Sequence, residues 1–437
     1  MDLLIKNGMI LTMNAGLEVI EKGAVRVRDG IIISVGKDDM EPSQEVPTRE
    51  IDAHGGIIMP GLINSHTHAA MTLFRGLADD LPLMEWLNDH IFPAEAKITA
   101  DMVYRGTLLA CAEMLLSGTT CFCDMYLFEE EVAKAASKAG MRAVVGEVLY
   151  DFPSPCYGPL DKGFEYVKTM MEKWKAHPLI TVAVEPHATY TCAPELLTRA
   201  ADMARTRQVP LVIHVAETRN EVKLIKEKYG KTPVNFLADL GILGPNVVAC
   251  HSVHLTPEER AVYRKFDVKV AHCPESNMKL ASGVAPVPEF LSEGICVALG
   301  TDGCASNNDL DLFQEMDSAA KLHKVFSMNP EAVDAASAVK MATINGARAL
   351  GLDESVGSLE PGKKADIIVV DTRSPHMVPM YNPYSQLVYA AKGSDVMLSI
   401  VDGKVLMENQ ALTTLDVDQV MDDVLAMAKK IAAGDGG

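Results

Sequence analysis

Residues 59–68 read MPGLINSHTH, an apolar run that opens into two histidines separated by one residue. In an extended strand, side chains two positions apart point to the same side, so His66 and His68 can bind one ion together. A catalytic zinc site needs at least three protein ligands and an open position. The run therefore predicts part of a metal site and requires other segments to supply the rest.

Strand and helix patterns alternate through the middle of the chain, between residues 59 and 359. The strand candidates end near His66, Cys123, Val148, His187, His214, His251, His272 and Asp302. The helical patterns cover residues 101–117, 129–138, 194–207 and 257–266, and the last two begin with a proline, which favours a helix start. Eight such alternations predict an α/β fold, a (β/α)8 TIM-type barrel. The alternative is a doubly wound open sheet, but its Gly-x-Gly-x-x-Gly turn is missing after the first strand.

Both ends of the chain contain short strand patterns, and Asp29-Gly30 between two of them indicates a tight hairpin. Neither end has enough strands for a core of its own. Because chain termini often lie close together, we predict one small β-sandwich domain from residues 1–58 plus 360–415, split by the barrel at 59–359. Residues 309–349 are predicted as two long helices, and residues 416–437 as a C-terminal helix.

The composition is that of a soluble globular protein, with 48% hydrophobic and 23% charged residues. The net charge of −19 argues against nucleic acids and anionic membranes as partners, since both would repel the chain. The first residues lack the apolar core of a signal peptide. The nine cysteines are scattered through apolar segments, which fits reduced core thiols, and Cys121-x-Cys123 is predicted to be buried rather than metal-bound. We expect a cytoplasmic protein that forms a homo-oligomer.

Histidines are concentrated at the predicted strand ends, where five of the eight carry one. In barrels, the C-terminal strand ends surround one active site. A set of three imidazoles and one carboxylate suits zinc or another divalent ion at a mononuclear hydrolytic site. The predicted ligands are His66, His68, His214 and Asp302. The fourth strand, residues 181–187, has no lysine that could bridge two ions, so we expect one Zn2+ per chain.

Two further residues are predicted to act in catalysis. Glu217 lies three residues beyond His214 and can pass a proton from water to a leaving group or ring nitrogen. His251 ends an apolar run and can orient the attacking water. Taken alone, each of these candidate residues would also fit a purely structural role. We assign a structural role to two further histidines, His254 and His272.

Several motifs together resemble the amidohydrolase superfamily: PGLINSHTH at 60–68, HVAET at 214–218, HSVH at 251–254, TDG at 301–303 and GSLEPGKKADIIV at 357–369. The likeness covers nearly the whole chain. Within that superfamily, RGLADDLPLMEWL at 75–87 and FPAE at 92–95 resemble the 5-methylthioadenosine/S-adenosylhomocysteine deaminases. The resemblance implies zinc-dependent hydrolytic deamination at C6 of adenosine derivatives, which yields inosine derivatives and ammonia.

The same resemblance implies roles for individual residues. His66, His68, His214 and Asp302 would bind the zinc ion. Substrate contacts would come from Glu95 at the ribose hydroxyls, from His187, from Glu217 at the purine N1, and from Asp302, which could also accept a proton from the water. His251 keeps the catalytic role assigned above.

One departure from that family concerns the third and fourth strands, where its arginines help to hold the amino-acid tail of S-adenosylhomocysteine. This chain has no arginine between Arg142 and Arg199. This interval therefore offers only lysines and no arginine for a bidentate grip on a carboxylate, and we predict a preference for neutral 5′ groups, as in 5′-methylthioadenosine, 5′-deoxyadenosine or adenosine.

Three alternatives are weighed against this prediction. An amidohydrolase-type deaminase or chlorohydrolase acting on free bases or triazines would share the metal ligands but need no ribose clamp. The zinc cytidine-type deaminases carry His-x-Glu and Pro-Cys-x-x-Cys, whereas this chain has His-x-x-Glu and no such cysteine pair. A barrel that serves only as a scaffold has no need to keep the ligands and Glu217 together.

Overall fold

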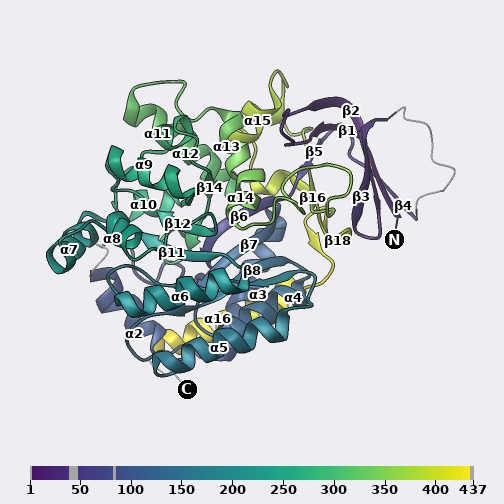
Figure 1. Cartoon of the computed structure of the whole chain (residues 1–437). Coiled ribbons are helices and arrows are strands. Elements are labelled where there is room, and N and C mark those ends of the chain that lie inside the picture. Colours follow the sequence, from purple (N-terminus) through teal and green to yellow (C-terminus); the bar gives the residue numbers. More distant parts are fainter. Residues whose placement is uncertain (1, 39–47, 82–84, 434–437) are drawn as a thin grey trace.

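The computed structural model describes residues 2–38, 48–81 and 85–433, and Figure 1 shows a barrel beside a terminal sheet. The barrel strands pair in parallel in two runs, β10-β8-β7-β6-β15 and β11-β12-β13-β14, with β9 alongside β8. Their bounds are β6 (Leu62–His68), β7 (Thr119–Tyr126), β8 (Arg142–Leu149), β9 (Ile180–Val182), β10 (Glu185–Pro186), β11 (Leu211–Val215), β12 (Val247–His251), β13 (Lys269–His272), β14 (Val297–Leu299) and β15 (Asp302–Gly303).

Two connections close these runs into one barrel. A parallel bridge between Val184 and Leu211 joins the β9–β10 segment to β11. At the other seam, β14 pairs with β13, and the next strand, β15, pairs with β6. The predicted α/β fold of TIM-barrel type is thus confirmed, and the C-terminal strand ends meet at one rim.

Strands from both ends of the chain form the second, nine-stranded sheet. Its order is β19-β18-β17-β16-β5-β1-β2-β3, with β4 beside β1. The bounds are β1 (Asp2–Leu11), β2 (Val19–Arg28), β3 (Ile31–Lys37), β4 (Arg49–Asp52), β5 (Ile57–Pro60), β16 (Ile367–Val370), β17 (Val396–Val401), β18 (Lys404–Glu408) and β19 (Ala411–Leu412).

Gly61 separates the two sheets within the run that carries the first histidines. Residues Ile57–Pro60 pair with β16 in the terminal sheet, whereas Leu62–His68 pair with β7 in the barrel. A Cβ atom at position 61 would lie 2.1 Å from the Thr120 Oγ1 atom, a distance that real Cβ atoms do not show. Glycine therefore lets the chain pass β7 and enter the barrel at this point.

The helices cover the outside of the barrel, and α6 (Pro194–Arg207) and α9 (Pro257–Phe266) begin at their prolines as predicted. The bounds of the others are α2 (Phe92–Glu95), α3 (Ala100–Leu116), α4 (Glu129–Ala139), α5 (Leu160–Trp174), α7 (Arg219–Tyr229), α8 (Pro233–Asp239), α10 (Pro274–Lys279), α11 (Val287–Ser292), α15 (Pro383–Tyr389) and α16 (Val417–Ala433). Short helical turns lie at η1 (Ala69–Phe74), η2 (Trp86–Ile91), η3 (Pro375–Met377) and η4 (Gly393–Asp395).

The prediction of two long helices over residues 309–349 was wrong. One long helix, α12 (Leu312–Ser327), is followed by two short ones, α13 (Ala335–Met341) and α14 (Ile344–Ala349). Met328 adopts a left-handed φ of 52° and Pro330 follows, so α12 cannot continue. Asp334 then caps α13 by accepting a hydrogen bond from the Ser337 N–H.

No helix among the described residues has the length and apolarity needed to cross a membrane. The described residues form two buried apolar clusters, one centred on the barrel and one on the terminal sheet. All nine cysteines are free, and Cys121 and Cys123 are fully buried in β7.

Candidate active site

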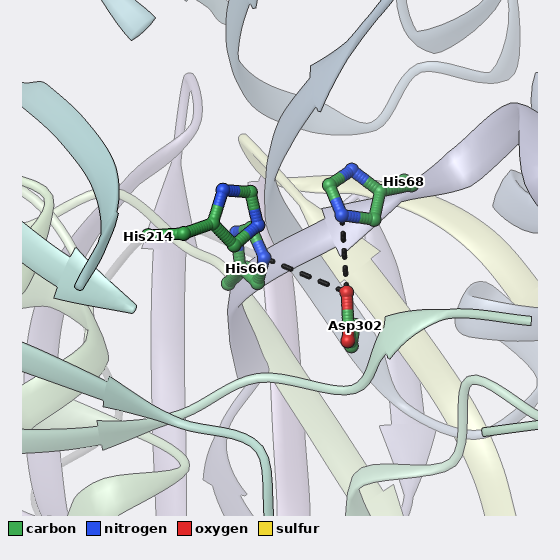
Figure 2. A group of neighbouring side chains, drawn as sticks. All are labelled: His66, His68, His214 and Asp302. Atoms are coloured by element: carbon green, nitrogen blue, oxygen red, sulfur yellow. Dashed lines mark ion pairs between the residues drawn. The ribbon is translucent and has the colours of Figure 1, made fainter. Parts of the chain in front are cut away.

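Four side chains meet at the rim formed by the C-terminal strand ends. His66 and His68 come from β6, His214 from β11 and Asp302 from β15, and one ligand atom from each lies within 4.8 Å of the others. Figure 2 shows the imidazole rings of His66 and His68 directed at the Asp302 carboxylate. The structure thus brings together the four predicted metal ligands from three strands that are distant in sequence.

Hydrogen bonds fix how two of these histidines present their nitrogens. The Nδ1 atom of His214 donates to the backbone carbonyl of His187 at 2.8 Å, and Nδ1 of His68 donates to the carbonyl of Met125. Since a carbonyl oxygen only accepts, each Nδ1 carries the hydrogen and leaves the Nε2 lone pair for a metal ion. This is the usual outer contact of a metal-binding histidine.

The surroundings of the His66 ring indicate whether a metal ion would fit between the four side chains. The His66 side chain is fully buried, and neither ring nitrogen lies within hydrogen-bond distance of a partner; Nε2 is 3.6 Å from Oδ1 of Asp302. Burial lowers the pKa of His66 to about 4, so the ring is neutral and has a free lone pair at neutral pH. An unpartnered buried nitrogen is costly unless a ligand satisfies it, and a divalent ion between these residues would do so.

Asp302 is held in a strained but well-supported position. Its φ is 60°, a left-handed conformation that costs energy for a residue other than glycine. The hydroxyls of Ser276 and Ser306 both donate to Oδ2, at 2.6 and 3.1 Å, which leaves Oδ1 to face the histidines. Burial opposes ionisation, yet the neighbouring His66 and His68 hold the pKa of Asp302 below its usual range. The carboxylate is therefore ionised and suited to bind a cation.

His251, the predicted catalytic histidine, stands beside the ligand cluster. Its Nδ1 contacts Oδ1 of Asn277 at 3.0 Å, and its Nε2 lies 3.9 Å from Oδ2 of Asp302. Its φ of 66° is again left-handed, so the backbone is strained at this position as well. The geometry places Nε2 where it can contact a water molecule at the cluster.

Glu217 lies at the same pocket and is 8% exposed. The Ser282 hydroxyl donates to its Oε1 at 3.2 Å. Burial raises the pKa of Glu217, and His251 and Ser282 only partly oppose this effect. A raised pKa makes the carboxylate a stronger base, which suits a residue that must accept a proton and pass it on.

Glu95 and His187, the predicted substrate contacts, line the pocket too. Glu95 ends α2, and burial raises its pKa to about 7. His187 follows β10, and its Nδ1 contacts the Thr191 hydroxyl at 2.8 Å. Burial lowers the pKa of His187 to about 3, so the ring is neutral and can exchange hydrogen bonds with a hydroxyl group.

Aromatic and apolar side chains make up most of the remaining pocket wall, and the sequence patterns did not identify them. The aromatic members are Trp86, Phe92, Tyr126, Tyr150, Phe152 and Tyr190. The rings of Tyr150 and Phe152 are stacked, with centroids 3.9 Å apart. Of these residues, Trp86 belongs to the motif at 75–87, and its place in that motif could have indicated a role in the pocket. Residues 82–84 of the motif lie outside the described residues.

The structure also locates the two histidines assigned structural roles. His254 contacts the backbone carbonyl of Ser282 through Nε2, and the Nε2 atoms of His272 and His323 lie 3.1 Å apart. Neither His254 nor His272 lines the pocket of the described residues. Both therefore remain outside the group of residues that can reach a substrate.

A parallel barrel with buried histidines and an aspartate at its strand ends defines a metal-dependent hydrolase. A model of the amidohydrolase family matches residues 57–406, and the chain belongs to this family. The resemblance inferred from the motifs is thus confirmed. The matched range includes all four clustered side chains.

Relatives and a solved structure match almost the full length of the chain. A 5-methylthioadenosine/S-adenosylhomocysteine deaminase of Syntrophobacter fumaroxidans is 56% identical over 430 residues, or 98% of each chain. A 5′-deoxyadenosine deaminase of Methanosarcina acetivorans is 46% identical over 434 residues, or 99% of each chain. The crystal structure of an adenosine deaminase from Xanthomonas campestris with bound zinc has a TM-score of 0.97, with 38% identity and 99% of each chain covered.

Proposed function

We propose that this chain catalyses zinc-dependent hydrolytic deamination at C6 of adenosine derivatives, which produces inosine derivatives and ammonia. The observation that carries the proposal is that three residues of the ligand cluster (His68, His214 and Asp302) line one pocket together with the proton-transfer candidate Glu217 and with Glu95. The names of the relatives support the same substrate class.

The cluster of His66, His68, His214 and Asp302 would hold one zinc ion. The solved structure of a similar adenosine deaminase contains bound zinc, which supports this choice of metal. Bound by this cluster, the ion would supply a Lewis acid that lowers the pKa of a water molecule. Glu217 would protonate the purine N1 as the water adds to C6, and Asp302 would accept a proton from that water. The proton on Asp302 would pass to the 6-amino group, which leaves as ammonia when the C6–N bond breaks, and the last proton of the water would return to Glu217. His251 would orient the water through Nε2, since its Nδ1 is engaged by Asn277.

The ribose would bind where Glu95 and His187 line the pocket. An ionised Glu95 can accept hydrogen bonds from two neighbouring ribose hydroxyls. His187 has its Nδ1 contact with Thr191, which leaves Nε2 for the substrate. These two residues would distinguish a nucleoside from a free base or a triazine.

For the 5′ group, we propose a preference for neutral substituents such as those of 5′-methylthioadenosine, 5′-deoxyadenosine and adenosine. Among the described residues that line the pocket there is no lysine or arginine. The wall instead offers aromatic rings, including the stacked Tyr150 and Phe152. A thioether packs favourably against such rings, whereas a carboxylate would be buried without a cationic partner.

A Glu95→Ala variant tests the proposal against a deaminase or chlorohydrolase that acts on free bases or triazines. If ribose recognition depends on Glu95, kcat/KM should fall by about 100-fold or more for nucleosides, because a buried polar contact is lost. Glu85→Ala, at an exposed position near the pocket, serves as the control. An unchanged kcat/KM for nucleosides in Glu95→Ala would overturn the ribose role.

We also propose how the molecule is organised. Residues 1–58 and 360–415 would form one small β-sandwich domain, residues 59–359 the barrel, and residues 416–437 a C-terminal helix, of which residues 434–437 lie outside the described residues. The mixing of β1–β5 with β16–β19 in one sheet supports this division. We further propose that the protein is a cytoplasmic homo-oligomer that acts on a small-molecule nucleoside and has no nucleic-acid or membrane partner, which fits its composition. Size-exclusion chromatography with light scattering tests the oligomeric state.

A further inference from the structure

Glu221 is a buried carboxylate that lies behind the pocket without lining it. It belongs to the first turn of α7 and is 2% exposed. Both of its oxygens accept hydrogen bonds: Oε2 from the backbone N–H of Glu217 at 2.9 Å, and Oε1 from the Thr189 hydroxyl at 2.7 Å. One side chain therefore connects two loops that leave neighbouring barrel strands.

Each of these loops carries a residue of the proposed chemistry. The loop after β11 carries Glu217, and the loop after β10 carries His187 two residues before Thr189. The two strand ends are adjacent, because Ala188 forms a parallel bridge with His214. Glu221 thus adds a side-chain link between the loop of Glu217 and the loop of His187, beyond the backbone bridge at the strand ends.

The loop of Glu217 needs such support because its backbone is strained. Ala216 has a φ of 52°, a left-handed conformation that an alanine adopts at an energetic cost. The chain turns there so that Glu217 can face the pocket. The hydrogen bond from the next N–H to Glu221 holds the turn in place, since a strained conformation persists only when its surroundings fix it.

Glu221 is itself held rigidly. The hydroxyl of Thr218 caps α7 by accepting the N–H of Glu221 at 3.2 Å. A carboxylate in the first helical turn is stabilised by the helix dipole. Thr189, the other partner, is fully buried. The bridge therefore rests on an ordered helix start and a buried loop rather than on a surface contact.

We propose that Glu221 is a positioning residue that fixes Glu217 relative to His187 through its contacts with the Glu217 backbone and the Thr189 hydroxyl. This inference rests on the proposed function, in which Glu217 transfers a proton and His187 contacts the substrate. Glu221 touches neither substrate nor metal ion. Its effect reaches the reaction only through the two loops.

Three substitutions separate the two contacts. Glu221→Ala removes both. Thr189→Val removes only the contact with the loop of His187. Glu221→Gln keeps both, because the amide oxygen can accept the Glu217 N–H while the amide nitrogen donates to a rotated Thr189 hydroxyl. Glu227→Ala is a matched control, since Glu227 lies on the same helix with a 63% exposed side chain.

The test measures kcat, KM and zinc content for each variant on whichever substrate the wild-type chain converts fastest. Glu221→Ala should lower kcat by about 100-fold at unchanged zinc content, the loss that a displacement of about 1 Å causes in a catalytic group. Thr189→Val should mainly raise KM. Glu221→Gln and the control should keep kcat and KM within about fivefold of the wild-type values. The double variant Thr189→Val/Glu221→Ala should have the same kcat as Glu221→Ala alone, because coupled contacts are not additive.

Two results would overturn the inference. The first is a kcat near the wild-type value in Glu221→Ala. The second is a loss of kcat in Glu221→Gln as large as that in Glu221→Ala, because this would show that the charge of Glu221 matters and not its two hydrogen bonds. If Glu221→Ala does not fold, the other two variants still test the proposal. An unchanged KM in Thr189→Val, or a large loss of kcat in Glu221→Gln, would contradict a positioning role for Glu221. A wild-type chain that converts only free bases or triazines would overturn the proposed function instead, and the variants would then be compared on that substrate.

Discussion

The Nε2 atom of His68 lies 3.0 Å from Oδ1 of Asp302, although the two residues come from the first and the last strand of the barrel. Strand β15 pairs with β6 in a register that places Gly303 opposite His68, so closing the barrel completes the ligand cluster. The metal site is therefore a product of the fold, and it cannot form unless both strands are in place.

The ligand role of Asp302 predicts a loss of bound metal in Asp302→Ala. Zinc content should fall well below one ion per chain, and activity should fall by a factor of about 1,000 or more, since the loss of a ligand disables the ion. Metal analysis of the purified protein and an activity assay measure both. His54→Ala, at an exposed histidine of the terminal sheet, should keep zinc and activity. Full zinc content in Asp302→Ala would contradict the assignment.

Glu217→Gln removes the proposed proton transfer but keeps the size of the side chain. We expect kcat to fall by a factor of about 100 to 10,000, the usual contribution of a general acid–base residue. Zinc content should not change, because Glu217 is not among the four clustered ligands. A variant with wild-type kcat would assign the proton transfer to another residue.

Glu95 predicts a pH dependence of substrate binding. Because burial raises its pKa to about 7, the carboxyl becomes protonated as the pH falls through 7 and then loses its ability to accept two hydrogen bonds. KM for a nucleoside should therefore rise as the pH is lowered from 8.5 to 5.5, while Glu95→Gln should show a higher KM that is flat over this range. A flat KM in the wild type would exclude this role for the ionised form.

A buried ion pair links the barrel to the terminal sheet. Arg142 in β8 donates two hydrogen bonds to Asp366, Nε to Oδ2 at 2.7 Å and Nη2 to Oδ1 at 3.0 Å. Asp366→Ala would leave the guanidinium buried without its partner and should lower the free energy of unfolding by about 3–5 kcal/mol. Denaturant unfolding measures the change. Lys6→Ala, which breaks an exposed pair with Glu50, should leave the midpoint unchanged.

The absence of lysine and arginine from the described pocket wall predicts the selectivity for the 5′ group. We expect kcat/KM for 5′-methylthioadenosine to exceed that for S-adenosylhomocysteine by about tenfold or more, because a carboxylate without a cationic partner is costly to bury. Steady-state kinetics on both substrates provides the comparison. A clear advantage for S-adenosylhomocysteine would contradict the prediction.

The ligand cluster could be predicted from the sequence because its residues follow apolar strand runs. His66, His214 and Asp302 each end or follow such a run, and parallel strands bring these ends to one rim. The barrel itself could be predicted from the same alternation. These predictions depended on local patterns, which determine strand and helix with little help from the rest of the chain.

Other features depend on contacts that no local pattern reveals. Tyr150 and Phe152 belong to the loop after β8, which hydrogen-bonds through Asp151 to the loop after β10. Nothing in the spacing of the two aromatic residues indicates a pocket wall. Glu221 looks like an exposed acid of a polar helix start, yet its contacts with Thr189 and the Glu217 backbone bury it. The break after α13 was missed because only Ala342 and Thr343 separate α13 from α14, and neither is a glycine or a proline.

The most direct test of the proposed function is ammonia release by the zinc-loaded chain from adenosine derivatives, free bases and triazines, with the metal-free chain as the control. We predict that 5′-methylthioadenosine, 5′-deoxyadenosine or adenosine yields ammonia and the matching inosine derivative, that a chelator abolishes this activity, and that zinc restores it. Faster conversion of free bases or triazines, or equal rates with and without zinc, would contradict the assignment.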